Sequence, residues 1–130
     1  MLAALRIPAL MMGLGSGALA ATIVSLLAAV GFQLAGAEGG ARAGLVPGMI
    51  VGFAVGGYVA GRMALHSHRF HGAVTGIGLT ALVVFVARGG GSDATIGQVL
   101  LLALIGIVVG GVFGTFAGRR GTSGGRTDFT

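Results

Sequence analysis

Two apolar stretches of this chain carry glycine at every fourth residue. The eight positions are Gly44, Gly48, Gly52, Gly56, Gly106, Gly110, Gly114 and Gly118. On an α-helix, this spacing places the glycines of each stretch on one line along the helix surface. In water, a glycine inside a helix costs about 1 kcal/mol relative to alanine. In a bilayer, the same line lets two helix backbones approach closely. The pattern therefore predicts membrane helices that pack through glycine zippers.

The composition agrees with an environment of lipid. The 130-residue chain is 55% hydrophobic and only 8% charged, with a mean hydropathy of +1.00, whereas soluble domains carry about 25% charged residues. The net charge of +5 comes from only eight basic side chains. These are too few for the dense basic face that binds phosphates, so we expect no nucleic-acid partner. The absence of cysteine excludes disulfides and thiolate sites.

Four apolar segments are long enough to cross a hydrocarbon core of about 30 Å, which needs about 20 helical residues. They cover residues 7–35, 44–65, 70–87 and 95–118. Short connections favour antiparallel neighbours, so the predicted fold is an all-α integral membrane bundle of four antiparallel transmembrane helices. Residues 1–118 form this domain, and residues 119–130 form a flexible polar tail. At the start of the fourth helix, Thr95 and Gln98 have the spacing of a capping box.

The first segment has an alternative interpretation as a signal peptide, because residues 35–37 (Ala-Gly-Ala) resemble a cleavage site. Its apolar stretch is much longer than the roughly 7–15 residues of a signal sequence, which favours a retained membrane helix.

The arginines predict the orientation of the helices. Six of the eight lie on the side that holds both termini and the middle connection, and two (Arg42 and Arg88) lie on the other. Basic residues are enriched in cytoplasmic loops. We therefore expect a multi-pass protein of the inner (plasma) membrane with both termini in the cytoplasm. The residues assigned to topology or to contacts with lipid headgroups are Arg62, Arg69, Arg119 and Arg120.

Three histidines cluster in the middle connection: His66, His68 and His71. Imidazoles bind zinc, copper or nickel, which makes these residues weak candidates for a metal site. No carboxylate or thiolate lies nearby, and Arg62 and Arg69 disfavour a cation. We predict no metal and no cofactor. A role in pH sensing stays open, because histidine titrates near neutral pH.

The membrane interior of the predicted bundle contains no acidic or basic residue, which argues against proton-coupled transport, and the spans carry no motif of a known enzyme class, so we expect no enzyme. Their polar side chains are Ser16, Thr22, Ser25, Tyr58, Thr75, Thr80 and Thr115. Such hydroxyls usually bond to helix backbones, although a lining of this kind would also suit a small channel or permease.

A stretch from Val55 to Arg62 (Val-Gly-Gly-Tyr-Val-Ala-Gly-Arg), together with residues 71–76 (His-Gly-Ala-Val-Thr-Gly), carries a family resemblance. It is similar to the YrzE-like four-helix bacterial membrane proteins, a domain of unknown function. Residues 110–114 resemble the closing segment of that family. The resemblance implies an architecture and no activity.

The leading functional hypothesis is a non-catalytic packing, assembly or oligomerisation protein. Its partners would be the lipid bilayer and either a second copy or another membrane protein. The small-residue line of the first segment (Gly13, Gly17, Ala21, Ser25 and Ala29) and the pair Gly72 and Gly76 add to the predicted packing residues. The alternative hypothesis is a small channel or permease for an ion or small solute.

Overall fold

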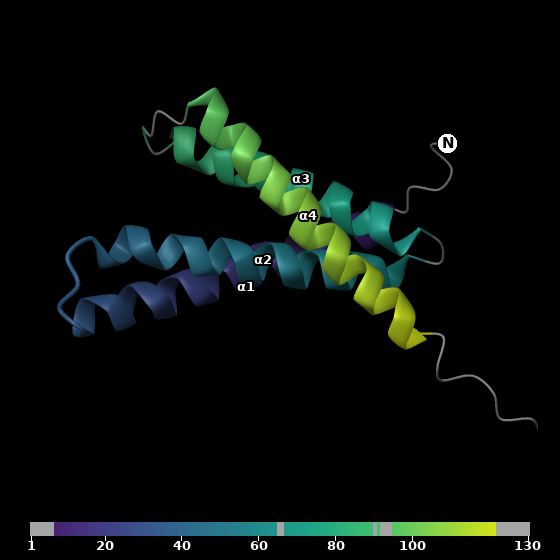
Figure 1. Cartoon of the computed structure of the whole chain (residues 1–130), viewed down its shortest axis with the longest axis horizontal. Coiled ribbons are helices and arrows are strands. Elements are labelled where there is room, and N and C mark those ends of the chain that lie inside the picture. The colour runs from purple at the N-terminus through teal and green to yellow at the C-terminus, as the bar shows by residue number, and fades with distance from the viewer. Residues whose placement is uncertain (1–6, 65–66, 90, 92–94, 122–130) are drawn as a thin grey trace, which may run out of the picture.

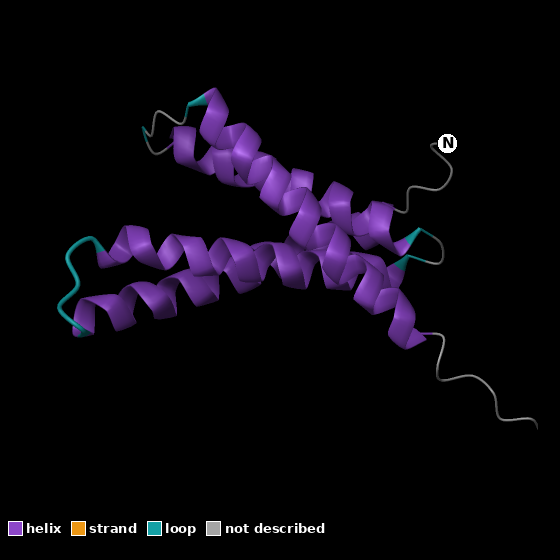
Figure 2. Ribbon diagram, in the orientation of Figure 1, coloured by secondary structure: helices purple, strands orange, loops and turns teal. Residues whose placement is uncertain are grey.

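The computed structural model is all-helical and describes residues 7–64, 67–89, 91 and 95–121 (Figures 1 and 2). Its helices are α1 (Ile7–Leu34), α2 (Gly40–Met63), α3 (His68–Gly89) and α4 (Ile96–Gly121). Each is long and apolar enough to cross a membrane. The chain is therefore compatible with a multi-pass membrane protein.

Most helix ends lie one to four residues from the predicted ones. α2 begins at Gly40 and not at Gly44, so that Pro47 is the eighth helical residue and does not lie in the first turn. A proline there donates no bond to the Ala43 carbonyl. α3 begins at His68, two residues early. α4 continues to Gly121, so residues 119–121 are helical and do not belong to the tail; residues 122–130 of that tail lie outside the described residues.

The predicted capping box at the start of α4 is confirmed. The Thr95 N–H donates to Gln98 Oε1 over 3.1 Å, and the Gln98 N–H donates to Thr95 Oγ1 over 3.4 Å. These reciprocal bonds satisfy two N–H groups that have no hydrogen-bond partner within the helix.

The four helices form two pairs (Figure 1). α1 lies along α2, and α3 lies along α4. The pairs meet where α2 ends, α3 begins and α4 ends, and we call this region the closed end. They diverge toward the α1–α2 and α3–α4 connections, and we call this region the open end. Because of this fork, α3 and α4 touch the other pair over only part of their length.

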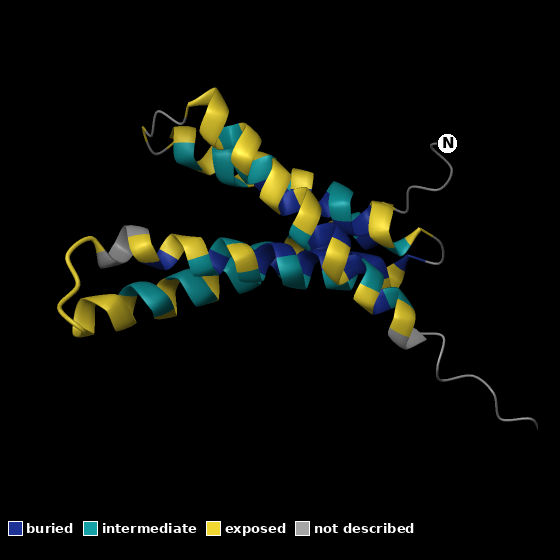
Figure 3. Cartoon of the chain, in the orientation of Figure 1, coloured by how far each residue is buried: buried dark blue, intermediate teal, exposed yellow. Residues whose placement is uncertain are grey.

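The helices are buried to different degrees (Figure 3). In the most apolar 18-residue window of each helix, 39% of the α2 residues are buried but only 6% of the α1 residues. α2 is thus the central helix, and it contacts each of the other three.

The buried core is made mostly of small side chains. Its apolar members are Ala9, Phe53, Ala60, Ala64, Leu79 and Ala117. Three polar residues, His71, Thr75 and Thr80, are also buried. Many large apolar side chains point outward instead, which suits a chain surrounded by acyl tails.

Candidate helix-packing site

The first glycine line of α2 faces α1 along its whole length. A Cβ atom placed on Gly44, Gly48, Gly52 and Gly56 would lie 2.8, 2.7, 2.9 and 2.8 Å from the carbonyl oxygens of Ser25, Ala21, Gly17 and Gly13, in that order. Real Cβ atoms essentially never come within 3.0 Å of such a neighbour. The two backbones are therefore too close for any side chain at these four positions. We call this contact the α1–α2 seam.

The glycines of α4 face α3 in the same way. A Cβ on Gly106 would lie 2.9 Å from the Gly76 oxygen, and a Cβ on Gly110 would overlap the Gly72 oxygen. On Gly114 it would lie 2.6 Å from the carbonyl oxygen of His68. The pair predicted at the start of the third helix, Gly72 and Gly76, thus lies directly against the α4 glycines.

A second glycine pair of α2 completes the closed end. A Cβ on Gly57 would lie 2.5 Å from the Gly110 oxygen, and one on Gly61 would lie 2.7 Å from Gly114 Cα. Gly110 and Gly114 therefore have α2 on one side and α3 on the other. Three helix backbones meet at this point, which we call the three-helix junction.

The histidines lie at the same end. His68 Nδ1 is 2.6 Å from the Gly61 oxygen, and because a carbonyl only accepts, this nitrogen is the donor. The His68 ring also lies against Gly118, whose Cβ would be 2.5 Å from His68 Cδ2. His68 thus bridges α2, α3 and α4.

His71 is buried, with Nδ1 3.3 Å from the Ser67 oxygen and its ring edge-on to Phe70. His66, the third histidine of the weak metal-site prediction, lies outside the described residues. Among the residues that the structure describes, no three His, Cys, Asp or Glu side chains gather as metal ligands would.

The hydroxyls of the spans bond mainly to their own helices. Thr75 Oγ1 donates to the His71 oxygen over 2.8 Å, and Thr80 Oγ1 donates to the Gly76 oxygen over 2.9 Å. Ser16, Thr22 and Thr115 make equivalent bonds to carbonyls three or four residues earlier. These donors are already used within one turn of helix.

The predicted topology arginines lie around the closed end. Arg62 is in the last turn of α2, Arg69 is the second residue of α3, and both are exposed. Arg119 is exposed near the end of α4, and Arg120 follows it in the same helix. The Arg69 stem lies 3.9 Å from where a Cβ of Gly111 would be, so its aliphatic part rests on α4.

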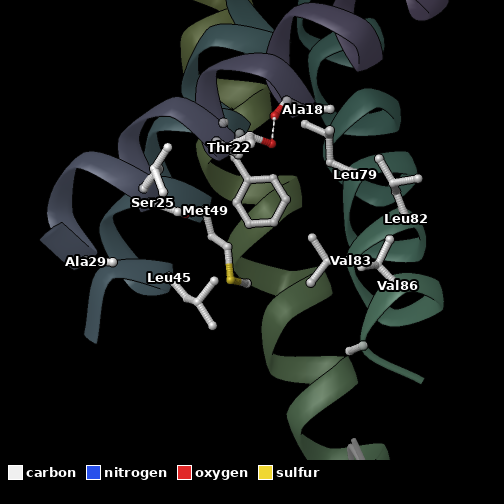
Figure 4. Close-up of a pocket in the computed structure, with 15 residues that line it drawn as sticks. Ala18, Thr22, Ser25, Ala29, Leu45, Met49, Leu79, Leu82, Val83 and Val86 are labelled. Carbon is white, nitrogen blue, oxygen red and sulfur yellow. Dashed lines mark hydrogen bonds between the residues drawn. The ribbon is translucent and has the colours of Figure 1, made fainter. Parts of the chain in front are cut away.

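At the open end, a groove of about 590 Å³ separates the two pairs (Figure 4). Its walls come from α1, α2 and α3: Ala18, Ala21, Thr22, Ser25, Leu26, Ala29, Leu45, Met49, Gly52, Phe53, Leu79, Leu82, Val83, Val86 and Ala87. Only Thr22 and Ser25 carry a polar side-chain atom, and the Thr22 hydroxyl donates to the Ala18 oxygen over 2.9 Å. The groove is thus an apolar surface without a reactive group.

Comparison with known proteins does not assign this chain to a family. No family model matches the chain, and no curated protein or solved structure gives a match.

Sequence reasoning did not select Gly57 and Gly61 as packing residues, although both belong to the three-helix junction. A signal was present: Leu45, Met49, Phe53, Gly57 and Gly61 follow one another at steps of four. This second line of α2 changes from large side chains to glycine halfway along, and such an interrupted line is a weaker pattern than an unbroken line of glycines. Leu79 was not predicted as a packing residue either, although its Cδ1 atom fills the space beside Gly17 and Gly56.

Proposed function

We propose that this chain is a non-catalytic membrane protein that acts in assembly, through contacts with a second copy or with another membrane protein. The observation that carries the proposal is the division of side chains by size: the glycines face neighbouring helices of the same chain, and the large apolar side chains face outward. The interior serves packing, and the outer surface is left for partners and lipid.

The proposed arrangement is an antiparallel bundle held by glycine zippers. Its support is the descending register of the α1–α2 seam, in which Gly44 pairs with Ser25 and Gly56 pairs with Gly13. Close approach of this kind suits a bilayer, where packing contacts replace the hydrophobic effect as the force between helices.

A non-catalytic role is supported by the state of the buried polar groups. His71, Thr75 and Thr80 are the buried polar residues of the described chain, and each has a backbone carbonyl within hydrogen-bonding distance. The channel or permease alternative needs hydroxyls turned toward a solute, and the bonds of Thr75 and Thr80 to their own helix do not favour it.

For the assembly surface, α4 is the preferred helix. Phe113 and Phe116 are both exposed on it, with ring centroids 6.1 Å apart. Aromatic side chains are enriched at the centres of protein interfaces. Their rings offer a large, rigid contact area to a second copy.

This role can be tested by the mass of the full-length protein in detergent, measured by sedimentation equilibrium over a range of concentrations. We expect a dimer or larger oligomer that dissociates in the double variant Phe113→Ala, Phe116→Ala. Phe85→Ala, which removes a still more exposed ring from α3, is the control and should leave the mass unchanged. A wild-type protein that stays monomeric at every concentration would contradict homo-oligomerisation.

The proposed location is the inner membrane with both termini in the cytoplasm, as the arginine distribution suggests. The YrzE-like resemblance, which would make the protein bacterial, has the same standing of a proposal. Reporter fusions at the C-terminus and at position 37 test the orientation. A cytoplasmic reporter should be active only at the C-terminus.

A further inference from the structure

At the closed end, two exposed arginines from different helices start beside the same hydrogen bond. His68 Nδ1 donates to the Gly61 oxygen over 2.6 Å. Arg62 follows Gly61 in α2, and Arg69 follows His68 in α3. Consecutive Cα atoms are about 3.8 Å apart, so each arginine is one residue away from this bond. The contact that joins α2 to α3 therefore also brings together the starting points of two guanidinium side chains.

A third arginine starts at the same place on α4. The His68 ring lies against Gly118, and Arg119 is the next residue of the chain. The side chains of Arg62, Arg69 and Arg119 are all exposed, and we call them the closed-end arginines. Each of three helices thus contributes one positive charge around His68.

The carboxylates of the described chain do not neutralise this charge. Within the described ranges, Glu38 is the sole acidic residue, and it lies in the α1–α2 connection at the open end. The stretch of α2 from Gly40 to Arg62 is about 33 Å long, which is several times the screening length of about 10 Å in salt solution. Glu38 is therefore too far from Arg62 and Arg69 to compensate them, and the closed end attracts anions.

The closed-end arginines lie at the depth of the lipid headgroups. The apolar spans end at Met63 and Arg119 and begin at His68, so every closed-end arginine is within one residue of a span boundary. The phosphates of a bilayer lie just outside its hydrocarbon core. Met63 and Phe70, which directly follow two of these arginines, are exposed apolar side chains. A ligand with a phosphate at this depth and an apolar body beside it is a phospholipid.

We propose that the closed end binds one anionic phospholipid, whose phosphate is held by Arg62 and Arg69 while Arg119 adds to the positive potential. A guanidinium pairs with phosphate oxygens through two parallel N–H groups. A soluble phosphate ester has the same head but no apolar body, so it would lack the contacts with Met63 and Phe70. The site is separate from the proposed assembly surface on α4 and does not depend on it.

Native mass spectrometry of the full-length protein in detergent tests the proposal by titration with dioleoyl phosphatidylglycerol or dioleoyl phosphatidylcholine. Both lipids carry the same chains and a phosphate, but only phosphatidylglycerol has a net negative charge. We expect one phosphatidylglycerol to bind about tenfold more tightly than phosphatidylcholine. Arg62→Gln and Arg69→Gln should each weaken its binding about fivefold, because one arginine near an anionic headgroup contributes about 1 kcal/mol.

Arg88→Gln is the matched control. Arg88 is also exposed and is also the last residue but one of its apolar span, but that span ends at the open end. The variant should bind phosphatidylglycerol as the wild type does. Helical circular dichroism identifies a variant that does not fold, in which case the other arginine variant and the comparison of the two lipids on the wild type still decide.

The number of bound lipids tells one shared site from separate surface charges. With a shared site, the wild type binds one phosphatidylglycerol tightly, and Arg62→Gln and Arg69→Gln weaken that same lipid. Two tightly bound lipids, of which one remains in each variant, would contradict the shared site.

A competition arm separates the lipid from a soluble anion. Glycerol phosphate, which has the phosphate without acyl chains, should not displace phosphatidylglycerol at an equal concentration. Displacement would assign the arginines to a soluble phosphate ester and overturn the proposal. Equal affinity for the two lipids, or equal effects of Arg62→Gln and Arg88→Gln, would also overturn it.

Discussion

At the closed end, Gly57 and Gly61 of α2 meet the backbone of α4, whereas at the open end the same line of α2 carries Leu45 and Met49 and faces a groove. Only side-chain size changes along this line, since its spacing stays at four residues. Glycine allows backbone contact, and larger side chains keep the helices apart. The fork therefore follows from where along α2 the small residues stop.

The partner helices show the same change. α3 has Gly72 and Gly76 in its first half and Leu82, Val83 and Val86 in its second. In α4 the buried glycines begin at Gly106. The small residues of all three helices thus lie at the closed end. Substitutions at four positions test this difference between the closed and open ends.

The largest effect is expected at the three-helix junction. Gly57→Leu would push a side chain into the Gly110 backbone, which cannot move without separating two helices. We expect a loss of about 3 kcal/mol in the free energy of unfolding, measured by circular dichroism in mixed micelles of dodecyl maltoside and sodium dodecyl sulfate. Gly15→Leu is the control, because a Cβ there meets nothing within 4 Å. Equal stability of the two variants would contradict the junction.

A smaller loss of stability is expected at Leu79, which lies where the groove meets the core. Leu79 is 4% exposed and packs its Cδ1 atom beside Gly17 and Gly56. Leu79→Ala should cost about 2 kcal/mol in the same assay, the low end of the range for a buried leucine, because lipid already solvates apolar groups. Leu101→Ala, at an exposed position of α4, should change stability little. A cost at Leu101 as large as at Leu79 would mean that burial does not set the difference.

The α1–α2 seam offers a test with a compensating change. A Cβ on Gly48 would overlap Ser25 Oγ and lie 2.7 Å from the Ala21 oxygen. Gly48→Ala should cost about 1 kcal/mol. The double variant with Ser25→Ala should recover part of it, since the nearest of the three obstructing atoms belongs to a side chain. If Ser25→Ala gives no recovery, the Ser25 hydroxyl is not the limiting contact.

The smallest effect is expected at the exposed start of α4, far from the junction. Thr95→Ala removes the Oγ1 acceptor of the capping box and should cost about 0.5 kcal/mol. Faster amide hydrogen exchange confined to the first turn of α4 would report it. Gln98→Glu keeps an acceptor for the Thr95 N–H and should exchange as the wild type does. Faster exchange throughout α4 would instead indicate a global change.

Several features could be predicted from the sequence because they depend on residues close together in the chain. The helical spans follow from the length of the apolar segments, and the capping box follows from Thr95 and Gln98 three residues apart. The start of α2 at Gly40 could not be read in this way. Pro47 is tolerated about two turns into this helix, although the first helical turn is where proline is normally favoured.

What the sequence determined by itself is the number of helices long and apolar enough to cross a membrane, because hydropathy and length are local properties of each segment. The tertiary structure decided which helix each glycine line faces: Gly44–Gly56 meets α1, and the α4 glycines meet α3, with α2 at the junction. It also decided that the two pairs diverge around a groove. Glycine on a line permits close approach from any helix that fits, and only the three-dimensional packing of all four selects one.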